Sequence, residues 1–371
     1  MEQKKLGFGC MRLPLTDPED QKSIDLEQMC RMTDTFLEKG FTYFDTAYMY
    51  HDYASETAVR EALVKRHPRD SYTLATKLPM AMITEEEAME RIFGEQLEKC
   101  GVDYFDYYLL HCLNDANYRM VEKLDAFGFI SKKKEEGRIR KIGFSYHDNA
   151  VLLDEILEAH PETEFVQLQL NYLDWDSVNI QSRECYEVCK KHGKPVIVME
   201  PVKGGTLAAV PEAAEELMKF YAPDASPASW AVRFAASQPD VMMVLSGMSN
   251  YDQLLDNTSY MAGFVPLNEE EMGIIQKVTE IINSSIAIPC TGCQYCVEGC
   301  PKEIPIPKYF ALYNAYKQFG DQSNSVFYYK NHEGKSGLAG DCVECGQCES
   351  HCPQHLTIID YMKQVSELFD K

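Results

Sequence analysis

The stretch CTGCQYCVEGCP occupies residues 290–301, and CVECGQCESHCP repeats its cysteine spacing at residues 342–353. Each run has the form C-x2-C-x2-C-x3-C-P, so eight of the 14 cysteines fall in two matched groups. In each run, the first three cysteines can wrap one compact cofactor in a tight loop. The fourth cysteine follows three residues later and points away, and the proline after it fixes the backbone φ angle. The pattern therefore predicts a cofactor with thiolate ligands.

This spacing resembles the motif of bacterial ferredoxins, which hold two [4Fe–4S] clusters and use the fourth cysteine of each run for the other cluster. The resemblance implies that one cluster is held by Cys290, Cys293, Cys296 and Cys352, and the second by Cys342, Cys345, Cys348 and Cys300. Zinc sites use pairs of C-x2-C in place of such triplets. Disulfides are disfavoured by the geometry of dense triplets. We therefore expect two iron–sulfur clusters.

The chain has 371 residues, of which 45% are hydrophobic and 25% are charged, as in an ordinary globular protein. This length accommodates a barrel with a smaller appended domain. The formal net charge of −22 argues against nucleic acid or an anionic membrane surface as a partner, because phosphate would be repelled. The sequence has no run of 18 apolar residues, and its start, MEQKKLGFGC, lacks the apolar region of an export signal. We expect a cytoplasmic protein, and the clusters favour a cell that lives with little oxygen.

Eight short apolar runs precede the cysteine runs, at spacings that leave room for a helix after nearly every one. They are LGFGC (6–10), FTYFDTA (41–47), YTLATK (72–77), YFDYYLLH (104–111), RKIGFS (140–145), FVQLQLN (165–171), KPVIVME (194–200) and VMMVLSG (241–247). Near-continuous apolar runs are typical of parallel strands buried on both faces. Repeated β–α units over about 280 residues predict an α/β fold, a (β/α)8 TIM barrel.

The last helix of the barrel is expected to start at Asn268 and Glu271, which have capping-box spacing. An earlier helix is expected to start at Thr84 with Glu87 and to end at Gly101. After a short link, the composition shifts to cysteine, glycine and proline. We therefore expect two domains, a barrel over residues 1–285 and a small ferredoxin-like iron–sulfur domain over residues 286–371.

The segment between the cysteine runs is longer than a bare ferredoxin needs. It contains KYFALYNAYKQF (308–319), which predicts a helix, and SVFYYKNHEG (325–334), which predicts an aromatic loop. We hypothesise that Phe327, Tyr328 and Tyr329 of this loop wall a substrate pocket. The alternative is that these aromatic side chains only pack the insert onto the barrel.

Four residues that can transfer or stabilise protons follow the ends of predicted strands. Asp45, Lys77 and His111 lie at three strand ends, and Tyr50 lies in the loop after Asp45. Active sites of such barrels lie at the C-terminal ends of the strands. A free tyrosine has a pKa near about 10, and a neighbouring ammonium lowers it. The four residues therefore predict general acid–base catalysis with electrostatic support.

At these positions, the chain resembles the aldo-keto reductase family. The stretch FDTAYMYHDYASE (44–56) and the endings LATK and LLH match the family's catalytic positions, in family order. The resemblance implies hydride transfer between a nicotinamide and a carbonyl or alcohol carbon. It also implies that Tyr50 is the general acid/base, that Lys77 tunes it, that Asp45 pairs with Lys77, and that His111 orients the substrate.

The resemblance extends to a nucleotide site. SGMSNYDQLLDN (246–257) resembles a run in reductases related to potassium-channel beta subunits and implies that the adenine half is contacted by Gly247, Ser249, Gln253, Asp256 and Asn257. Ser145 and Gln167 match the positions that hold the carboxamide, while Met199 replaces the aromatic residue that usually stacks on nicotinamide. Gly247 and Gln253 leave the usual 2′-phosphate positions without a cation, so both NADP(H) and NAD(H) are retained as cofactors.

The way in which the two halves cooperate is open at the level of sequence. Clusters pass single electrons and nicotinamide passes a hydride, so communication needs an electron-pair splitter such as a flavin, for which no motif is present. In the first interpretation, the clusters exchange electrons with a ferredoxin- or flavodoxin-type partner. In the second, they are structural staples of a small domain. In the third, the chain is a non-catalytic electron carrier or docking protein on a barrel scaffold.

Overall fold

The structure, a computed structural model, describes residues 4–371 with the exception of residues 178–179, 285, 291, 293, 298, 333 and 353. Its chain forms two compact units. The barrel unit comprises Met1–Val202 and Ser229–Asn268, and the cysteine-rich unit comprises Lys203–Ala228 and Glu269–Lys371. The expected domain boundary falls at residue 285, outside the described residues, and stays a prediction.

The barrel unit contains one closed sheet of eight parallel strands, which confirms the predicted (β/α)8 barrel. Each strand pairs with the next along the chain, and β8 pairs with β1 to close the ring. The strands are β1 (Leu6–Gly9), β2 (Tyr43–Asp45), β3 (Thr73–Leu78), β4 (Phe105–Leu113), β5 (Ile139–Tyr146), β6 (Phe165–Gln169), β7 (Val196–Met199) and β8 (Val241–Gly247). All eight apolar runs of the sequence form these strands.

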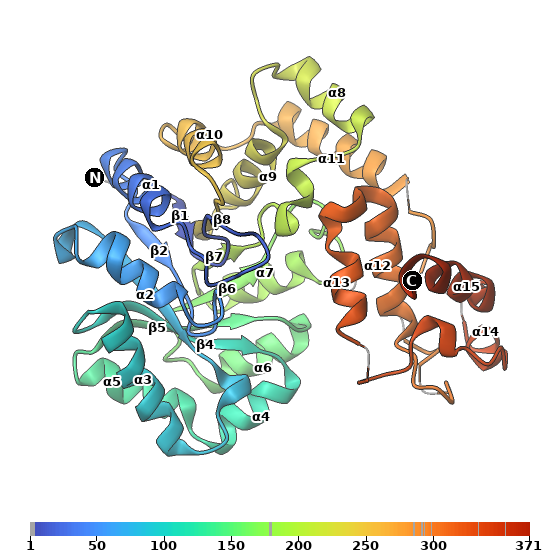
Figure 1. Ribbon diagram of the computed structural model, residues 1–371, viewed down its shortest axis with the longest axis horizontal. Helices are drawn as coiled ribbons and strands as arrows, with labels where there is room; N and C mark the ends of the chain where they lie inside the picture. Colours follow the sequence, from blue (N-terminus) through green and yellow to red (C-terminus); the bar gives the residue numbers. More distant parts are fainter. Residues whose placement is uncertain are drawn as a thin grey trace. The chain divides into compact units, whose positions relative to one another are not determined.

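Helices surround the strands of the barrel unit (Figure 1). They are α1 (Leu26–Glu38), α2 (Ser55–Val59), α3 (Glu86–Cys100), α4 (Asp115–Lys123), α5 (Ala126–Glu135), α6 (Ala150–Ala159), α7 (Ser182–Lys191), α9 (Pro227–Ala236, which begins just before the division) and α10 (Tyr251–Met261). Gly101 ends α3 in the left-handed conformation, as predicted. The predicted start at Thr84 is wrong, because the N-cap of α3 is Glu85, whose side chain makes no capping bond.

One layer of side chains fills the barrel interior and fixes where the polar residues lie. It consists of Tyr43, Ala75, Leu109, Phe165, Ile197, Met243 and Leu245. Side chains two residues apart on a strand share a face. Asp45, Lys77 and His111 therefore share the interior face with Tyr43, Ala75 and Leu109, one layer nearer the C-terminal end of the barrel.

The cysteine-rich unit has a repeated plan. Its helices are α8 (Glu212–Tyr221), α11 (Glu269–Ser284), α12 (Ile306–Phe319), α13 (Ser325–Lys330), α14 (Gln347–Ser350) and α15 (Ile358–Phe369). Both α12 and α15 begin six residues after the last cysteine of a run, at Ile306 after Cys300 and at Ile358 after Cys352. The helix predicted for residues 308–319 is confirmed as α12. The predicted aromatic loop is wrong, because residues 325–330 form α13.

Candidate functional site

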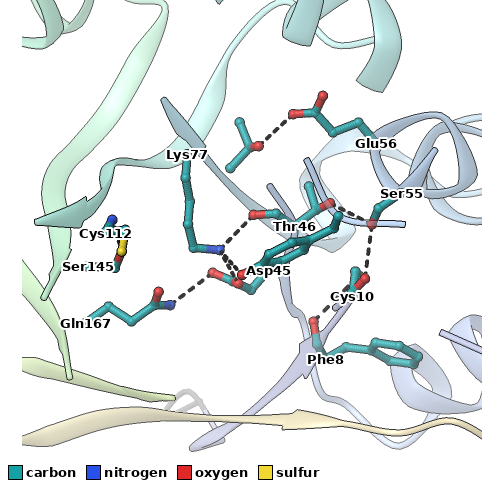
Figure 2. A network of polar contacts seen from close by, with 12 residues as sticks. Phe8, Cys10, Asp45, Thr46, Ser55, Glu56, Lys77, Cys112, Ser145 and Gln167 are labelled. Carbon is teal, nitrogen blue, oxygen red and sulfur yellow. Dashed lines mark hydrogen bonds and ion pairs between the residues drawn. The ribbon is translucent and has the colours of Figure 1, made fainter. Parts of the chain in front are cut away.

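Lys77 lies at the centre of the predicted proton-transfer site. Its Nζ donates hydrogen bonds to Asp45 Oδ1 at 2.5 Å, to the carbonyl oxygen of Thr46 at 2.8 Å and to the Tyr50 hydroxyl at 3.3 Å. The Lys77 and Asp45 side chains are almost completely buried. Figure 2 shows the Lys77 amine directed at Asp45 and Thr46, with Gln167 approaching Asp45 from another strand. The structure therefore brings Asp45, Tyr50 and Lys77 together as the sequence predicts.

The electrostatics of this group favour a charged lysine beside a neutral phenol. Burial disfavours the Lys77 ammonium, but the adjacent Asp45 carboxylate and Tyr50 hydroxyl raise the pKa of Lys77 overall. Burial raises the pKa of Tyr50, and the nearby Lys77 ammonium, which lowers it, only partly offsets this effect. The expectation of a lowered tyrosine pKa is therefore wrong for this state of the site. Tyr50 is protonated at neutral pH and can act as an acid.

His111 lies beside the phenol. Its ring centroid is 6.0 Å from that of Tyr50, and the two ring planes are nearly perpendicular. Burial lowers the pKa of His111 well below its usual range, and Lys77 and His147 lower it further. The imidazole is therefore neutral at pH 7, with one N–H available as a donor. This is the state needed to donate a hydrogen bond to a carbonyl oxygen.

Further polar residues, which the sequence interpretation missed, fix the strand ends around Lys77. The Ser55 hydroxyl lies 2.8 Å from the Thr46 hydroxyl and donates to the Cys10 carbonyl oxygen at 3.1 Å, which joins β1, β2 and α2 (Figure 2). These serine and threonine residues belong to the stretch DTAYMYHDYASE, so the signal was present in the chain. Nothing in the sequence indicated that their hydroxyls would meet.

Glu56 is a second buried group near the site. It is fully buried and accepts hydrogen bonds from Thr76 Oγ1 at 2.7 Å and Gln96 Nε2 at 2.8 Å. Gln96 Nε2 also lies 3.0 Å from the carbonyl oxygen of Lys77, so the network reaches the backbone of the catalytic lysine. Burial raises the pKa of Glu56, although these hydrogen bonds oppose the shift. Burial therefore favours the uncharged form of this carboxyl group, while the hydrogen bonds hold Glu56 against β3.

The loop after Tyr50 has an uncommon backbone. His51, Asp52 and Tyr53 have φ angles of 51°, 48° and 72°, in the left-handed region that favours glycine. Such a residue costs about 1–3 kcal/mol unless its surroundings impose the conformation. The hydrogen bond from Ser55 N to the Tyr50 carbonyl oxygen, at 3.2 Å, closes this loop. The position of the phenol is therefore set by strained backbone.

The residues predicted to hold the carboxamide lie next to this group. Ser145 and Gln167 are buried on β5 and β6, at paired positions of the sheet. Ser145 Oγ accepts a hydrogen bond from Cys112 N at 2.8 Å, and Gln167 Nε2 donates to Asp45 Oδ2 at 3.2 Å. No bond within the described chain uses the Ser145 hydroxyl proton or the Gln167 carbonyl oxygen, so both can hold an amide. Met199 lies half-buried at the end of β7.

The predicted adenine contacts divide into exposed and buried residues. Gly247, Ser249 and Gln253 are exposed around the start of α10, and Asp256 is half-buried. Asn257 is buried, where its amide donates to Ser246 Oγ at 2.7 Å and accepts from the Tyr260 hydroxyl at 2.6 Å. Asn257 therefore joins α10 to β8, and its predicted contact with the adenine half stays a prediction.

Two paired glycines leave room for backbone approach at the end of the barrel. Gly9 of β1 pairs with Gly247 of β8. A Cβ on Gly9 would lie 3.2 Å from the Ser246 carbonyl oxygen, and one on Gly247 would lie 3.1 Å from Arg12 Cβ. Arg12 forms no hydrogen bond or ion pair with another described residue. The exposed backbone at Gly247 and the neighbouring Arg12 guanidinium could together bind a phosphate group of a dinucleotide.

The cysteines of the cysteine-rich unit surround two cavities. Cys300, Cys342, Cys345 and Cys348 line one cavity, with apolar neighbours that include Ile304 and Met362. Cys290, Cys296 and Cys352 line a second cavity. Cys293 and Pro353 lie outside the described residues.

Each cavity combines the first cysteines of one run with the last cysteine of the other run. This is the crossed arrangement that the resemblance to bacterial ferredoxins implies, and thiolates around a pocket with apolar walls fit a [4Fe–4S] cluster. The Gly292 N–H also lies 3.4 Å from Cys290 Sγ, where it can stabilise a thiolate. Ligation of the clusters by these cysteines stays a prediction.

The three aromatic residues of the insert, Phe327, Tyr328 and Tyr329, differ in their surroundings. Tyr329 is buried within the cysteine-rich unit, stacks on Phe369 and donates a 2.6 Å hydrogen bond to Asp370. Phe327 and Tyr328 are exposed. The hypothesis of a pocket wall is therefore wrong for Tyr329, whose side chain belongs to the core of its own unit.

Comparison with known proteins identifies both parts of the chain. Residues 5–280 match the model of the aldo/keto reductase family, and residues 289–357 match the model of a 4Fe-4S dicluster domain. Within the described part of the chain, no helix is both long and apolar enough to cross a membrane.

Individual relatives agree with the first match. An uncharacterized oxidoreductase of Schizosaccharomyces pombe is 27% identical over 69% of this chain and 81% of its own length. The uncharacterized oxidoreductase YqkF of Bacillus subtilis is 25% identical over 76% of this chain and 94% of its own. An aldo-keto reductase structure from Bacillus halodurans is 26% identical, with a TM-score of 0.58 over 74% of this chain and 91% of its own. An aldo-keto reductase of Klebsiella pneumoniae, solved with NADPH, has a TM-score of 0.55 at 20% identity over 75% of this chain and 96% of its own.

Proposed function

Because the chain belongs to the aldo/keto reductase family and carries a 4Fe-4S dicluster domain, we propose that it is a nicotinamide-dependent oxidoreductase acting on a carbonyl or alcohol compound. The observation that carries the proposal is the Lys77 amine, which contacts both the Asp45 carboxylate and the Tyr50 hydroxyl. A reduced nicotinamide bound at the barrel end would supply the hydride. NADP(H) and NAD(H) are both candidates, and the NADPH complex of the Klebsiella relative makes NADPH the first to test.

The side chains of this site supply the proton and the charge stabilisation. In the reduction direction, neutral His111 donates a hydrogen bond to the substrate carbonyl oxygen and orients it. Tyr50 donates its hydroxyl proton to that oxygen as negative charge develops there. The Lys77 ammonium stabilises the tyrosinate that remains, and Asp45 holds the ammonium in place. Ser145 and Gln167 present free hydrogen-bonding groups to the nicotinamide carboxamide.

We further propose that two [4Fe–4S] clusters occupy the two cavities of the cysteine-rich unit. They would exchange single electrons with a ferredoxin- or flavodoxin-type partner. The crossed cysteine sets and their apolar walls support this proposal. In the alternative, the clusters only stabilise the fold of this unit. The small hydrophobic core of the unit is the argument for this alternative. Reducing the clusters chemically, with and without added flavin, and then measuring reduction of NADP⁺ distinguishes the two; no transfer in either case favours staples.

The catalytic proposal is tested with anaerobically purified protein and the variant Tyr50→Phe. We expect the variant to lose at least about 100-fold in kcat for carbonyl reduction, since it lacks the donated proton. Its affinity for NADPH and the electron paramagnetic resonance spectra of its reduced clusters should match those of the wild type. Turnover that survives the substitution would contradict the role of Tyr50. Iron, sulfide, nucleotide and flavin analysis of the same preparation tests the cofactors.

A further inference from the structure

The loop that carries the proposed acid is held by one side chain that the catalytic scheme does not use. His51 follows Tyr50 directly and is only 6% exposed. Together with Asp52 and Tyr53, it forms a run of three left-handed residues, none of which is glycine. Because L-residues disfavour this conformation, something outside the run has to impose it.

The imidazole of His51 bonds a separate segment at both of its nitrogens. Nδ1 lies 3.0 Å from the Gln21 carbonyl oxygen, and Nε2 lies 3.0 Å from the Leu13 backbone nitrogen. A carbonyl oxygen can only accept and a backbone N–H can only donate. His51 is therefore the neutral tautomer with its proton on Nδ1, and both ring nitrogens are satisfied.

The segment that His51 bonds is itself ordered. Residues 14–25 form a small hairpin, in which Leu15 and Ile24 form an antiparallel bridge and Thr16 N donates to Ser23 O at 2.8 Å. This hairpin connects β1 to α1. His51 thus anchors the loop after Tyr50 to this hairpin through Gln21 and to the residue that precedes the hairpin, Leu13.

We propose that His51 is a positioning residue for Tyr50. Its two hydrogen bonds impose the left-handed run, and that run sets the phenol 3.3 Å from the Lys77 amine. Asp52 has an exposed side chain, and the exposed Tyr53 has an edge-on contact with the Tyr48 ring and a 4.0 Å contact with Met82 Sδ, so the two bonds of His51 are the main side-chain hydrogen bonds of the run. This inference rests on the proposed function, because positioning matters only if Tyr50 donates the proton.

Replacement of His51 separates hydrogen bonding from backbone strain. His51→Gly removes both bonds and accepts positive φ without cost. Asp52→Gly is the matched control, since it also accepts positive φ but removes neither bond. His51→Asn tolerates the left-handed conformation and can keep the bond to Gln21, since an Asn side-chain amide takes the place of Nδ1.

We expect His51→Gly to lower kcat by about 10–100-fold, because a small misplacement of a reacting group costs rate steeply. Its KM for NADPH should stay that of the wild type, since the nucleotide residues are untouched. The kcat of His51→Asn should lie between those of the wild type and His51→Gly. Asp52→Gly should keep the wild-type kcat. Faster hydrogen exchange of the Leu13 amide in His51→Gly would report loss of the anchor directly.

The outcomes separate this inference from the proposed function. If the wild type binds NADPH and turns over but His51→Gly keeps full kcat while its Leu13 amide exchanges fast, the positioning role is wrong. The same holds if Asp52→Gly loses as much kcat as His51→Gly, because strain alone would then explain the effect. If the wild type reduces no carbonyl compound, the proposed function fails first. In that case, two other measurements still show whether His51 holds the loop. They are the hydrogen-exchange rate of the Leu13 amide and the titration of Tyr50, which is monitored by NMR of labelled tyrosine.

Discussion

Lys77 shows how one buried charge can serve both stability and catalysis. Its contact with Asp45 satisfies a carboxylate that would otherwise be buried unpaired, and its contact with Tyr50 prepares a negative charge on the phenol. The strand-end positions of Asp45 and Lys77 predicted their meeting, because the C-terminal ends of barrel strands converge on one site, whereas Tyr50 reaches that site from the loop after Asp45. The sign of the net pKa shift of Tyr50 could not be predicted, since burial depends on the whole barrel.

Replacement of Lys77 should therefore affect two measurements in different ways. We expect Lys77→Met to lower the free energy of unfolding by about 3–5 kcal/mol, because Asp45 loses its partner in a buried site. The double variant Asp45→Asn/Lys77→Met should recover part of this stability but none of the activity. Urea unfolding and steady-state kinetics of the two variants check this. Equal stability of single and double variants would show that the buried pair is not coupled.

The raised pKa of Tyr50 fixes the alkaline side of the pH profile. Because the proton donor stays protonated above the usual tyrosine range, kcat for reduction should be constant between pH of about 7 and 9 and should fall only above about 10. Stopped-flow single turnovers at saturating NADPH measure this step without product release. A decline that is already complete by pH 8 would point to a different acid.

At the scale of elements, the predictions drawn from the cysteine runs agree better with the structure than those drawn from local helix and loop signals. The resemblance of their spacing to the ferredoxin motif implied the crossed arrangement of Cys300 and Cys352, and the lining of the two cavities agrees with it. The capping box at Thr84 and the loop at residues 325–334 were wrong. Both depended on local signals that packing overrides: α3 begins after Glu85, whose side chain makes no capping bond, and buried Tyr329 belongs to a helix.

The crossed arrangement can be tested with a pair of matched variants. Cys300→Ala should damage the cluster held by the run at residues 342–348, and Cys352→Ala should damage the one held by the run at residues 290–296. Each variant should retain one [4Fe–4S] signal in electron paramagnetic resonance, and the two surviving signals should differ. If each substitution instead removed the cluster of its own run, the two cavities would be assigned wrongly.

At the scale of the molecule, the barrel could be predicted from the sequence. The division of the chain into a barrel unit and a cysteine-rich unit was harder to predict. The apolar runs predicted all eight strands, because each run is long enough to be a buried strand. Nothing in residues 203–228 indicated that they would group with the segment after residue 268, since this grouping depends on tertiary contacts, among them those between α8 and α11.

Buried neutral histidines should make the barrel sensitive to acid. Burial lowers the pKa of His111, and of His51 despite its bond to Gln21 and the charge of Asp52. Their stabilising contribution is present above the unfolded value of about 6.5 and is lost as pH falls toward the folded values. Each can add a slope of up to about 1.4 kcal/mol per pH unit. His111→Gln should flatten the fall in unfolding free energy between pH 7 and 5, measured with urea; parallel curves would contradict this.

The alternation that fills the barrel also constrains how the chain can change. Tyr43, Ala75 and Leu109 pack the interior, and two positions later the same strand faces carry Asp45, Lys77 and His111. An in-frame deletion of Leu110 would therefore remove a buried leucine and turn His111 outward toward the helices, and it would shift buried Leu113 in the same way. Insertions and deletions in this lineage should accumulate in the loops and spare the strands, because packing and chemistry depend on the same count of residues.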